Sequence, residues 1–248
     1  YSPDQIAERV ETVGVKKARL HPRTTIALGT LGGGFIGLGA MLYTFLVSDP
    51  SASHSPPTRF LGGFGFSVGL ILVVIAGAEL FTGNNLLVMA WAGKRISTRE
   101  MVRNWVLFFF SNLIGAVGLA VLMAFTGSLK GEFGAAAIRI AQSKSSLTFT
   151  EGFSRGILCN VFVCLAVWLA MAGRSVTDRI FAIILPVTAF VALGFEHSIA
   201  NLYLFSVAAS LGEFQLNWGG IVLNLASVTL GNIVGGAGMV ALVYHLVY

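Results

Sequence analysis

Charged side chains are scarce in this sequence. Asp, Glu, Lys and Arg together make up 11% of the 248 residues, whereas hydrophobic residues make up 55%. A soluble domain carries about 25% charged residues, so this chain has too little charge to cover a surface that faces water. The mean hydropathy of +0.81 agrees with this. We therefore expect an all-α polytopic membrane protein, with lipid as the solvent of most of its surface.

Groups for metal binding, covalent catalysis and nucleic-acid binding are also scarce. The two cysteines, Cys159 and Cys164, lie in one apolar run, which predicts buried free thiols and no disulfide framework. No His-x-x-x-His or comparable metal spacing occurs, and no Ser or Cys nucleophile has an identifiable partner. The net charge is +5, but no basic stripe is interleaved with aromatic residues. We expect no cofactor, no nucleic-acid partner and no enzymatic activity.

The apolar residues form six runs, each long enough to cross the hydrocarbon core, for which about 20 residues suffice. The runs cover residues 24–47, 60–91, 104–125, 152–171, 180–208 and 218–247. The second run is longer than one crossing needs and contains Glu79, so a broken helix is expected there. Residues 1–22 place hydrophobic side chains at helical spacing among charged ones, which predicts an amphipathic cytoplasmic helix at the membrane surface.

Two polar interruptions of the apolar runs resemble each other. Residues 77–84 and 194–201 share the pattern Gly-x-Glu-x-x-x-x-Asn. Asn112 and Asn232 begin a second matching stretch at nearly the same offset. Interruptions at matching positions of two halves indicate a transport site between repeats. Because each unit would hold three spans, an odd number, the second unit should be inverted relative to the first. The units are expected to span residues 23–127 and 128–248.

Positive charge is distributed unequally among the loops. Most Lys and Arg residues lie before the first run, between the second and third runs, or between the fourth and fifth. Because cytoplasmic loops are enriched in Lys and Arg, both termini are expected in the cytoplasm. The minority on the opposite side comprises Arg59, Lys130, Arg139, Lys144 and Arg155.

The polar residues of the fifth run point to a transport path. A charged side chain near the bilayer centre costs about 2.5–3.5 kcal/mol, so such residues face a protein interior or an aqueous path. His197 is the only histidine deep in a run, and its place in a repeated interruption favours a functional role over a packed core imidazole. Glu79 and Glu196 are interpreted as structural carboxylates that cap broken helix ends, because a negative charge would repel an anion.

Donors for a small anion are present near both interruptions. Half-helix N-termini expose N–H groups and a partial positive charge. Lys144 is expected to be a loop residue at the outer mouth of the fourth span, where it would attract anions. Further side-chain donors are Thr82, Asn84, Asn160, Asn201 and Asn232.

Four ordered motifs give the chain a specific resemblance. They are the stretches 78–84, 159–168, 194–201 and 231–236. In these stretches and their spacing, the chain resembles the formate/nitrite transporter family over essentially its whole length. The resemblance implies an aquaporin-like protomer of six transmembrane helices with two broken helices, a homopentameric assembly, and one substrate path in each protomer. It also implies the inner (cytoplasmic) membrane of a prokaryote.

The resemblance also implies roles for individual residues. The central polar group would be His197, supported by Glu196, with Lys144 in the outer vestibule and a gate at the second-span break. The implied path and proton-relay residues are His197, Glu196, Lys144, Asn160, Thr82, Asn201 and Asn232. The implied constrictions are Phe66 and Phe190 toward the outside, Leu70 and Leu80 toward the cytoplasm, and Val163 between them. The break itself would hold Glu79, Phe81 and Asn84.

The resemblance implies a small monovalent weak-acid anion as substrate. The wording Leu-Phe-Thr-Gly-Asn at residues 80–84 favours formate, while nitrite and hydrosulfide stay open. The substrate could take a proton from His197 and cross as the neutral acid, or pass as an anion beside a protonated His197.

Two other classes of protein stay open. A neutral-solute channel shares the architecture but lacks Asn-Pro-Ala boxes here, and an intramembrane enzyme would use His197 and Glu196 as acid and base.

Overall fold

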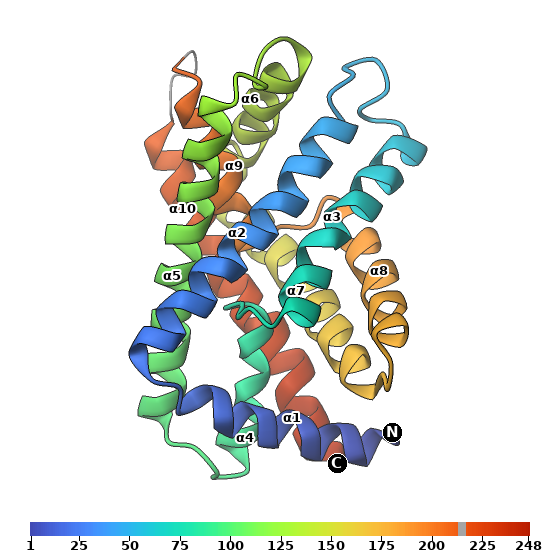
Figure 1. Ribbon diagram of the computed structural model, residues 1–248, viewed down its shortest axis with the longest axis vertical. Coiled ribbons are helices and arrows are strands. Elements are labelled where there is room, and N and C mark those ends of the chain that lie inside the picture. The colour runs from blue at the N-terminus through green and yellow to red at the C-terminus, as the bar shows by residue number, and fades with distance from the viewer. Residues whose placement is uncertain (213–216) are drawn as a thin grey trace.

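The computed structural model describes residues 1–212 and 217–248, and these residues form helices, turns and loops without a β-strand (Figure 1). The expected all-α class is therefore confirmed for this part of the chain. The elements are α1 (Pro3–Ala18), α2 (Pro22–Leu46), α3 (Pro56–Ala76), η1 (Gly83–Leu86), α4 (Leu87–Ala92), α5 (Thr98–Phe125), α6 (Glu132–Ser145), α7 (Phe149–Ala172), α8 (Val176–Ala192), α9 (Ser198–Ser210), α10 (Trp218–Ile233), η2 (Val234–Leu242) and α11 (Val243–Val247).

Membrane-spanning length is reached by five helical stretches of the described chain. These are α2, α3, α5, α7 and the continuous stretch Trp218–Val247, which contains α10, the π-helical segment η2 and α11. The apolar run 180–208 is divided into α8 and the short apolar helix α9. Each expected run therefore lies largely in helices, and the fifth run is divided between α8 and α9.

The interruption expected in the second run is confirmed. Helix α3 ends at Ala76, and Gly77 follows in the left-handed region with φ 83°. A side chain with a Cβ rarely adopts that conformation, so glycine here ends the helix cheaply. A turn then leads to the 3₁₀ segment η1 and to α4. The polar residues of 79–84 thus lie at a true break in the helix.

The fifth run breaks in the same way. Helix α8 ends at Ala192, and Gly194 has φ 75°. The chain then runs without helix through Phe195 and Glu196 until α9 begins at Ser198, with His197 as the residue that caps it. Gly77 and Gly194, the glycines of the repeated motif, therefore both lie where a helix ends in the middle of the protein.

Close approach of helix α2 to its neighbours depends on glycine. A Cβ on Gly33 would overlap the backbone carbonyl of Asn112 in α5, and a Cβ on Gly115 would overlap the carbonyl of Thr30 in α2. Small residues let helix backbones approach where lipid provides no hydrophobic driving force. The glycine-rich face of α2 is thus a packing face, and it positions α5 and its asparagines against the first break.

Short helices cover the two ends of the bundle. Helix α1 lies across the end that also holds both termini, and α6 lies at the opposite end (Figure 1). The amphipathic character expected for residues 1–22 is confirmed, since Ile6 and Val10 are buried. Helix α6 was not expected. Lys144, interpreted as a loop residue, in fact lies in the last turn of α6, because the loop holding it contains enough alanine to form a helix.

We predict that Gly115→Ala destabilises the protein, because a methyl group forced against the Thr30 carbonyl costs about 1–3 kcal/mol. Gly118→Ala, on the same helix, is the matched control. No neighbouring heavy atom lies within 4 Å of its added Cβ, and alanine favours a helix by about 1 kcal/mol over glycine. Thermal denaturation in detergent, followed by size-exclusion chromatography, should separate the two variants. Equal melting temperatures would contradict this account of the α2–α5 packing.

Candidate functional site

Two cavities enter the protein from opposite ends. The α6-side cavity has a volume of about 340 Å³ and reaches Glu196 and His197. The α1-side cavity has a volume of about 220 Å³ and reaches Glu79 and Leu80. Each cavity therefore ends at one of the two helix breaks, where the polar residues of the repeated motif are found.

The expected constriction residues divide between the two cavities. Phe66 and Phe190 line the α6-side cavity, and Leu70 and Leu80 line the α1-side cavity. The Phe66 and Phe190 rings meet edge to face, with centroids 5.8 Å apart. The His197 ring is stacked on Phe190 at 6.1 Å. An anion that entered from the α6 side would thus leave water at two aromatic rings and meet the imidazole next.

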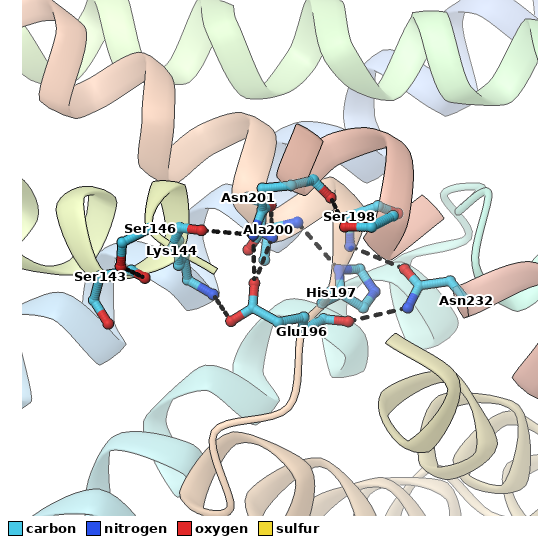
Figure 2. A network of polar contacts seen from close by, with 11 residues as sticks. Ser143, Lys144, Ser146, Glu196, His197, Ser198, Ala200, Asn201 and Asn232 are labelled. Carbon is cyan, nitrogen blue, oxygen red and sulfur yellow. Dashed lines mark hydrogen bonds and ion pairs between the residues drawn. The ribbon is translucent and has the colours of Figure 1, made fainter. Parts of the chain in front are cut away.

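His197 is held by hydrogen bonds at both ring nitrogens. Its Nδ1 accepts the backbone N–H of Ala200 at 3.1 Å, as Figure 2 shows, and its Nε2 lies 2.9 Å from the Thr82 hydroxyl. A backbone nitrogen always carries its hydrogen, so Nδ1 must offer a lone pair. The ring proton therefore sits on Nε2, and the imidazole is neutral in this arrangement. Only 3% of His197 is exposed, so the ring joins the two breaks at a largely buried position at the end of the α6-side cavity.

Glu196 is surrounded by donors at the base of the α6-side cavity (Figure 2). Lys144 Nζ donates to its Oε1 at 2.8 Å, and Asn201 Nδ2 donates to its Oε2 at 2.7 Å. Asn224 donates to the same Oε2 at 3.4 Å and to the backbone carbonyl of Lys144 at 2.9 Å. The carboxylate is thus paired and hydrogen-bonded, as a buried charge must be, and its repulsion of an anion is largely cancelled by Lys144.

Glu79 has a matching set of neighbours at the first break. Lys17 Nζ of α1 lies 3.0 Å from Glu79 Oε2 and donates to Asn84 Oδ1 at 3.0 Å. The pair with Glu79 is an ion pair by distance, although Glu79 Oε2 receives no aligned hydrogen bond. Asn84 donates to Asn104, and Asn104 donates to the backbone carbonyl of Lys17 at 3.0 Å. Lysine, glutamate and two asparagines therefore meet in both halves.

Two asparagines hold the backbone of the breaks. Asn112 donates to the carbonyl of Glu79 at 2.9 Å and accepts the N–H of Phe81 at 2.9 Å. Asn232 donates to the carbonyl of Glu196 at 3.0 Å and accepts the N–H of Ser198 at 3.0 Å, as drawn in Figure 2. These side chains replace hydrogen bonds that the interrupted helix cannot make.

The same contacts revise two interpretations made from the sequence. Glu79 and Glu196 do not cap the broken helices with their carboxylates, because His197 and the asparagines do so. The first N–H groups of α9 are also used within the protein, by Asn232 and His197, so they are weaker anion donors than the sequence suggested. The helix ends were assigned from residue type alone, and only the geometry shows which side chain reaches which N–H.

The remaining expected site residues are buried beside the path. Asn160 donates to the carbonyls of Thr82 and Asn232 at 3.2 and 2.7 Å, so it ties the two breaks together. Val163 is buried in the core, and the Phe81 ring packs edge to face on Phe109. None of these side chains lines either cavity in the described structure.

Sequence analysis missed four members of the site. Asn112 was recognised as part of the repeat, but its hydrogen bonds to the backbone of the break were not predicted. Lys17 lies in an amphipathic helix beside Lys16, which faces water, and nothing in the sequence distinguishes the two. The separation between the lysine and the glutamate differs between the halves, so the pattern that matched Glu79 with Glu196 did not extend to the lysines. The missed residues are Lys17, Asn104, Asn112 and Asn224.

One difference between the halves falls at the residue that follows each glutamate. Leu80 follows Glu79, whereas His197 follows Glu196. Each half thus places a paired glutamate at its break, but only one half places an imidazole there. Apolar spanning helices, two helix breaks and two cavities that each end at one of these breaks define an integral membrane protein of the channel and transporter class.

The chain belongs to the formate/nitrite transporter family. The family description "Formate/nitrite transporter" matches residues 4–246. The chain is similar to the formate channel FocA of Escherichia coli strain K12, with 36% identity over 99% of this chain and 94% of the relative. These relatives are channels and transporters, so the chain is not an enzyme.

Two solved structures resemble the fold. One, an "FNT family ion channel", has a TM-score of 0.91 and 31% identity, and the match covers 99% of each chain. The other, a "Pentameric formate channel with formate bound", has a TM-score of 0.82 and 40% identity, and the match covers 92% of this chain and 97% of that one.

We predict that Lys17→Met lowers both thermal stability and transport, because it leaves Glu79 as a nearly buried carboxylate without its cation. The expected loss is about 1–3 kcal/mol, below the 3–5 kcal/mol of a fully buried pair, since the Lys17 side chain keeps 23% exposure. Lys16→Met removes an exposed neighbour on the same helix and serves as the control. Melting temperature and flux that drop equally in both variants would show that Lys17 has no special role.

Proposed function

We propose that the protein is a homopentameric channel of the prokaryotic inner membrane that conducts a small monovalent weak-acid anion, with formate as the first choice. The neutral His197 ring carries this proposal, because it stands behind the aromatic pair at the end of the α6-side cavity and touches Thr82 of the other break. The formate channels among the relatives and the pentameric neighbour support the choice of substrate and assembly.

We propose the corresponding topology of six spans, with the termini in the cytoplasm. The α1-side cavity then faces the cytoplasm, and the α6-side cavity faces outward. The matched Lys–Glu–Asn–Asn contacts support an inverted repeat of two units. They favour including α1 in the first unit, as the partner of α6 in the second, so that the repeated structure begins before residue 23.

The proposed mechanism separates attraction from neutralisation. Cavity cations raise the local concentration of the anion. The aromatic pair then removes its water, which is costly for a bare carboxylate. In the exchange step, a protonated His197 gives the proton on Nε2 to a formate oxygen, which leaves formic acid and a neutral imidazole whose remaining proton is on Nδ1. Uptake of a proton at Nε2 and release of the one on Nδ1 then restore the resting tautomer and the hydrogen bond to Ala200. The ring is reprotonated after the neutral acid has passed.

The hydrogen bond to Ala200 limits this exchange. A second ring proton must sit on Nδ1, where it would meet the N–H of Ala200. Both groups would then be donors, so protonation of His197 must break the cap of α9. A helix cap contributes about 1 kcal/mol of stability, so thermal motion can break this one. Proton loading of the path and loosening of the first turn of α9 are therefore one event.

Flux measurements test the choice of substrate. Purified protein in liposomes should conduct formate in stopped-flow experiments at two pH values, with nitrite and hydrosulfide measured in the same preparation. Formate flux well above protein-free liposomes is the expected result. Faster nitrite or hydrosulfide flux would reassign the substrate within the family, and water or glycerol flux without anion flux would favour a neutral-solute channel.

We predict that His197→Asn abolishes the pH dependence of flux while the protein still folds. Asparagine is a good N-cap and cannot titrate near neutrality, so it separates the cap from proton exchange. In the wild type, flux should rise as pH falls, because a larger fraction of His197 then carries the second ring proton that the exchange step needs. His197→Phe, which keeps ring bulk but loses both functions, should reduce proton-coupled flux by about tenfold or more. Wild-type pH dependence in both variants would make His197 a purely structural residue.

A further inference from the structure

The α6-side cavity concentrates positive charge beyond what a monovalent anion needs. Four of the Lys and Arg residues on that side of the protein line it, and Glu196 is the only carboxylate among its lining residues in the described structure. Two of the four cations are already engaged. Lys144 is paired with Glu196 at 2.8 Å, and Arg139 contacts Glu132 at 3.6 Å and the Ser48 carbonyl at 2.8 Å.

Arg59 and Arg155 are different. Both are partly buried, and neither forms an ion pair with a carboxylate of residues 1–212 or 217–248. Arg59 Nη2 lies 3.1 Å from the position that a Cβ would take on Gly194. The carbonyl of Arg155 accepts the N–H of Glu196 at 3.3 Å. The two arginines therefore approach the same short break, Arg59 from α3 and Arg155 from α7.

The opposite cavity lacks such a pair. Its lining cations are Arg9, Lys17 and Arg179. Arg9 stacks on the Tyr1 ring at 4.3 Å, Lys17 pairs with Glu79, and Arg179 donates to the Gly173 carbonyl at 3.5 Å. Each of these cations has a protein partner, so of the two cavities only the α6-side cavity is lined by arginines without one in the part of the chain that the structure describes.

We propose that the α6-side cavity binds a short dicarboxylate of three or four carbons through Arg59 and Arg155, and that the bound dicarboxylate blocks the path. Guanidinium groups bind carboxylates in a bidentate manner, and a volume of about 340 Å³ admits such a molecule. Formate has one carboxylate for the two arginines, whereas a dicarboxylate offers one carboxylate to each of them. A divalent anion gains twice the electrostatic attraction of a monovalent one but loses far more hydration at Phe66 and Phe190, so it binds and does not cross.

Binding is tested by titrating succinate into the purified, detergent-solubilised protein in a calorimeter at low ionic strength, where screening is weak. Arg59→Gln and Arg155→Gln should each weaken binding by about tenfold, and the double variant should show none. Arg179→Gln, at the opposite cavity, is the matched control and should bind succinate as the wild type does. Acetate, with one carboxylate, should bind at least about tenfold more weakly. No succinate binding to the wild type, or undiminished binding to the double variant, would overturn the proposal.

Blocking is tested in liposomes, and this part alone rests on the proposed function. External succinate should inhibit formate flux through the wild type competitively, and the double variant should escape inhibition. If the wild type binds succinate in an arginine-dependent manner but conducts no formate, the transport proposal fails while the binding site stands. If formate flux is normal and saturating succinate leaves it unchanged, the blocking role is overturned.

Discussion

The backbone of a helix that stops in the middle of a membrane protein must still be hydrogen-bonded, and the rest of this structure depends on that requirement. Lipid cannot satisfy the N–H and C=O groups exposed at the two breaks, and buried side chains do so instead. Asn112 and Asn232 each bind a carbonyl and an N–H of a break. They can reach it because glycines bring the helices that carry them into backbone contact. The close packing and the polar site are thus consequences of one constraint.

The charged residues at the breaks follow the same logic. A lone buried glutamate would be expensive, and each glutamate here has a lysine from a short helix at the end of the bundle. Those short helices are in turn fixed by asparagines that bind the lysine carbonyls. Each of these surface helices therefore supplies the cation that neutralises a buried glutamate. The position of the helix depends on the charge of that glutamate.

Much of the fold could be predicted from the sequence, because lipid imposes a simple rule on length and polarity. The apolar runs, both breaks and the amphipathic start were found in this way, and the repeated Gly-x-Glu pattern located the centre of the site. Helix α6 was not predicted, since it is short and only moderately apolar. Lys17 and the helix cap at His197 escaped because they depend on which side chain reaches a particular atom across the fold, and spacing along the chain carries no record of that.

The difference between Leu80 and His197 at corresponding positions of the two breaks has a consequence for the stoichiometry of the proposed proton exchange. A path with an imidazole at each break could pass protons from one ring to the other as a wire. This path has a single ring, and in its resting tautomer that ring has one vacancy for a proton, already occupied by a backbone contact. In the proposed exchange, the ring can load no more than one proton at a time, and each loading must wait for the first turn of α9 to release Nδ1.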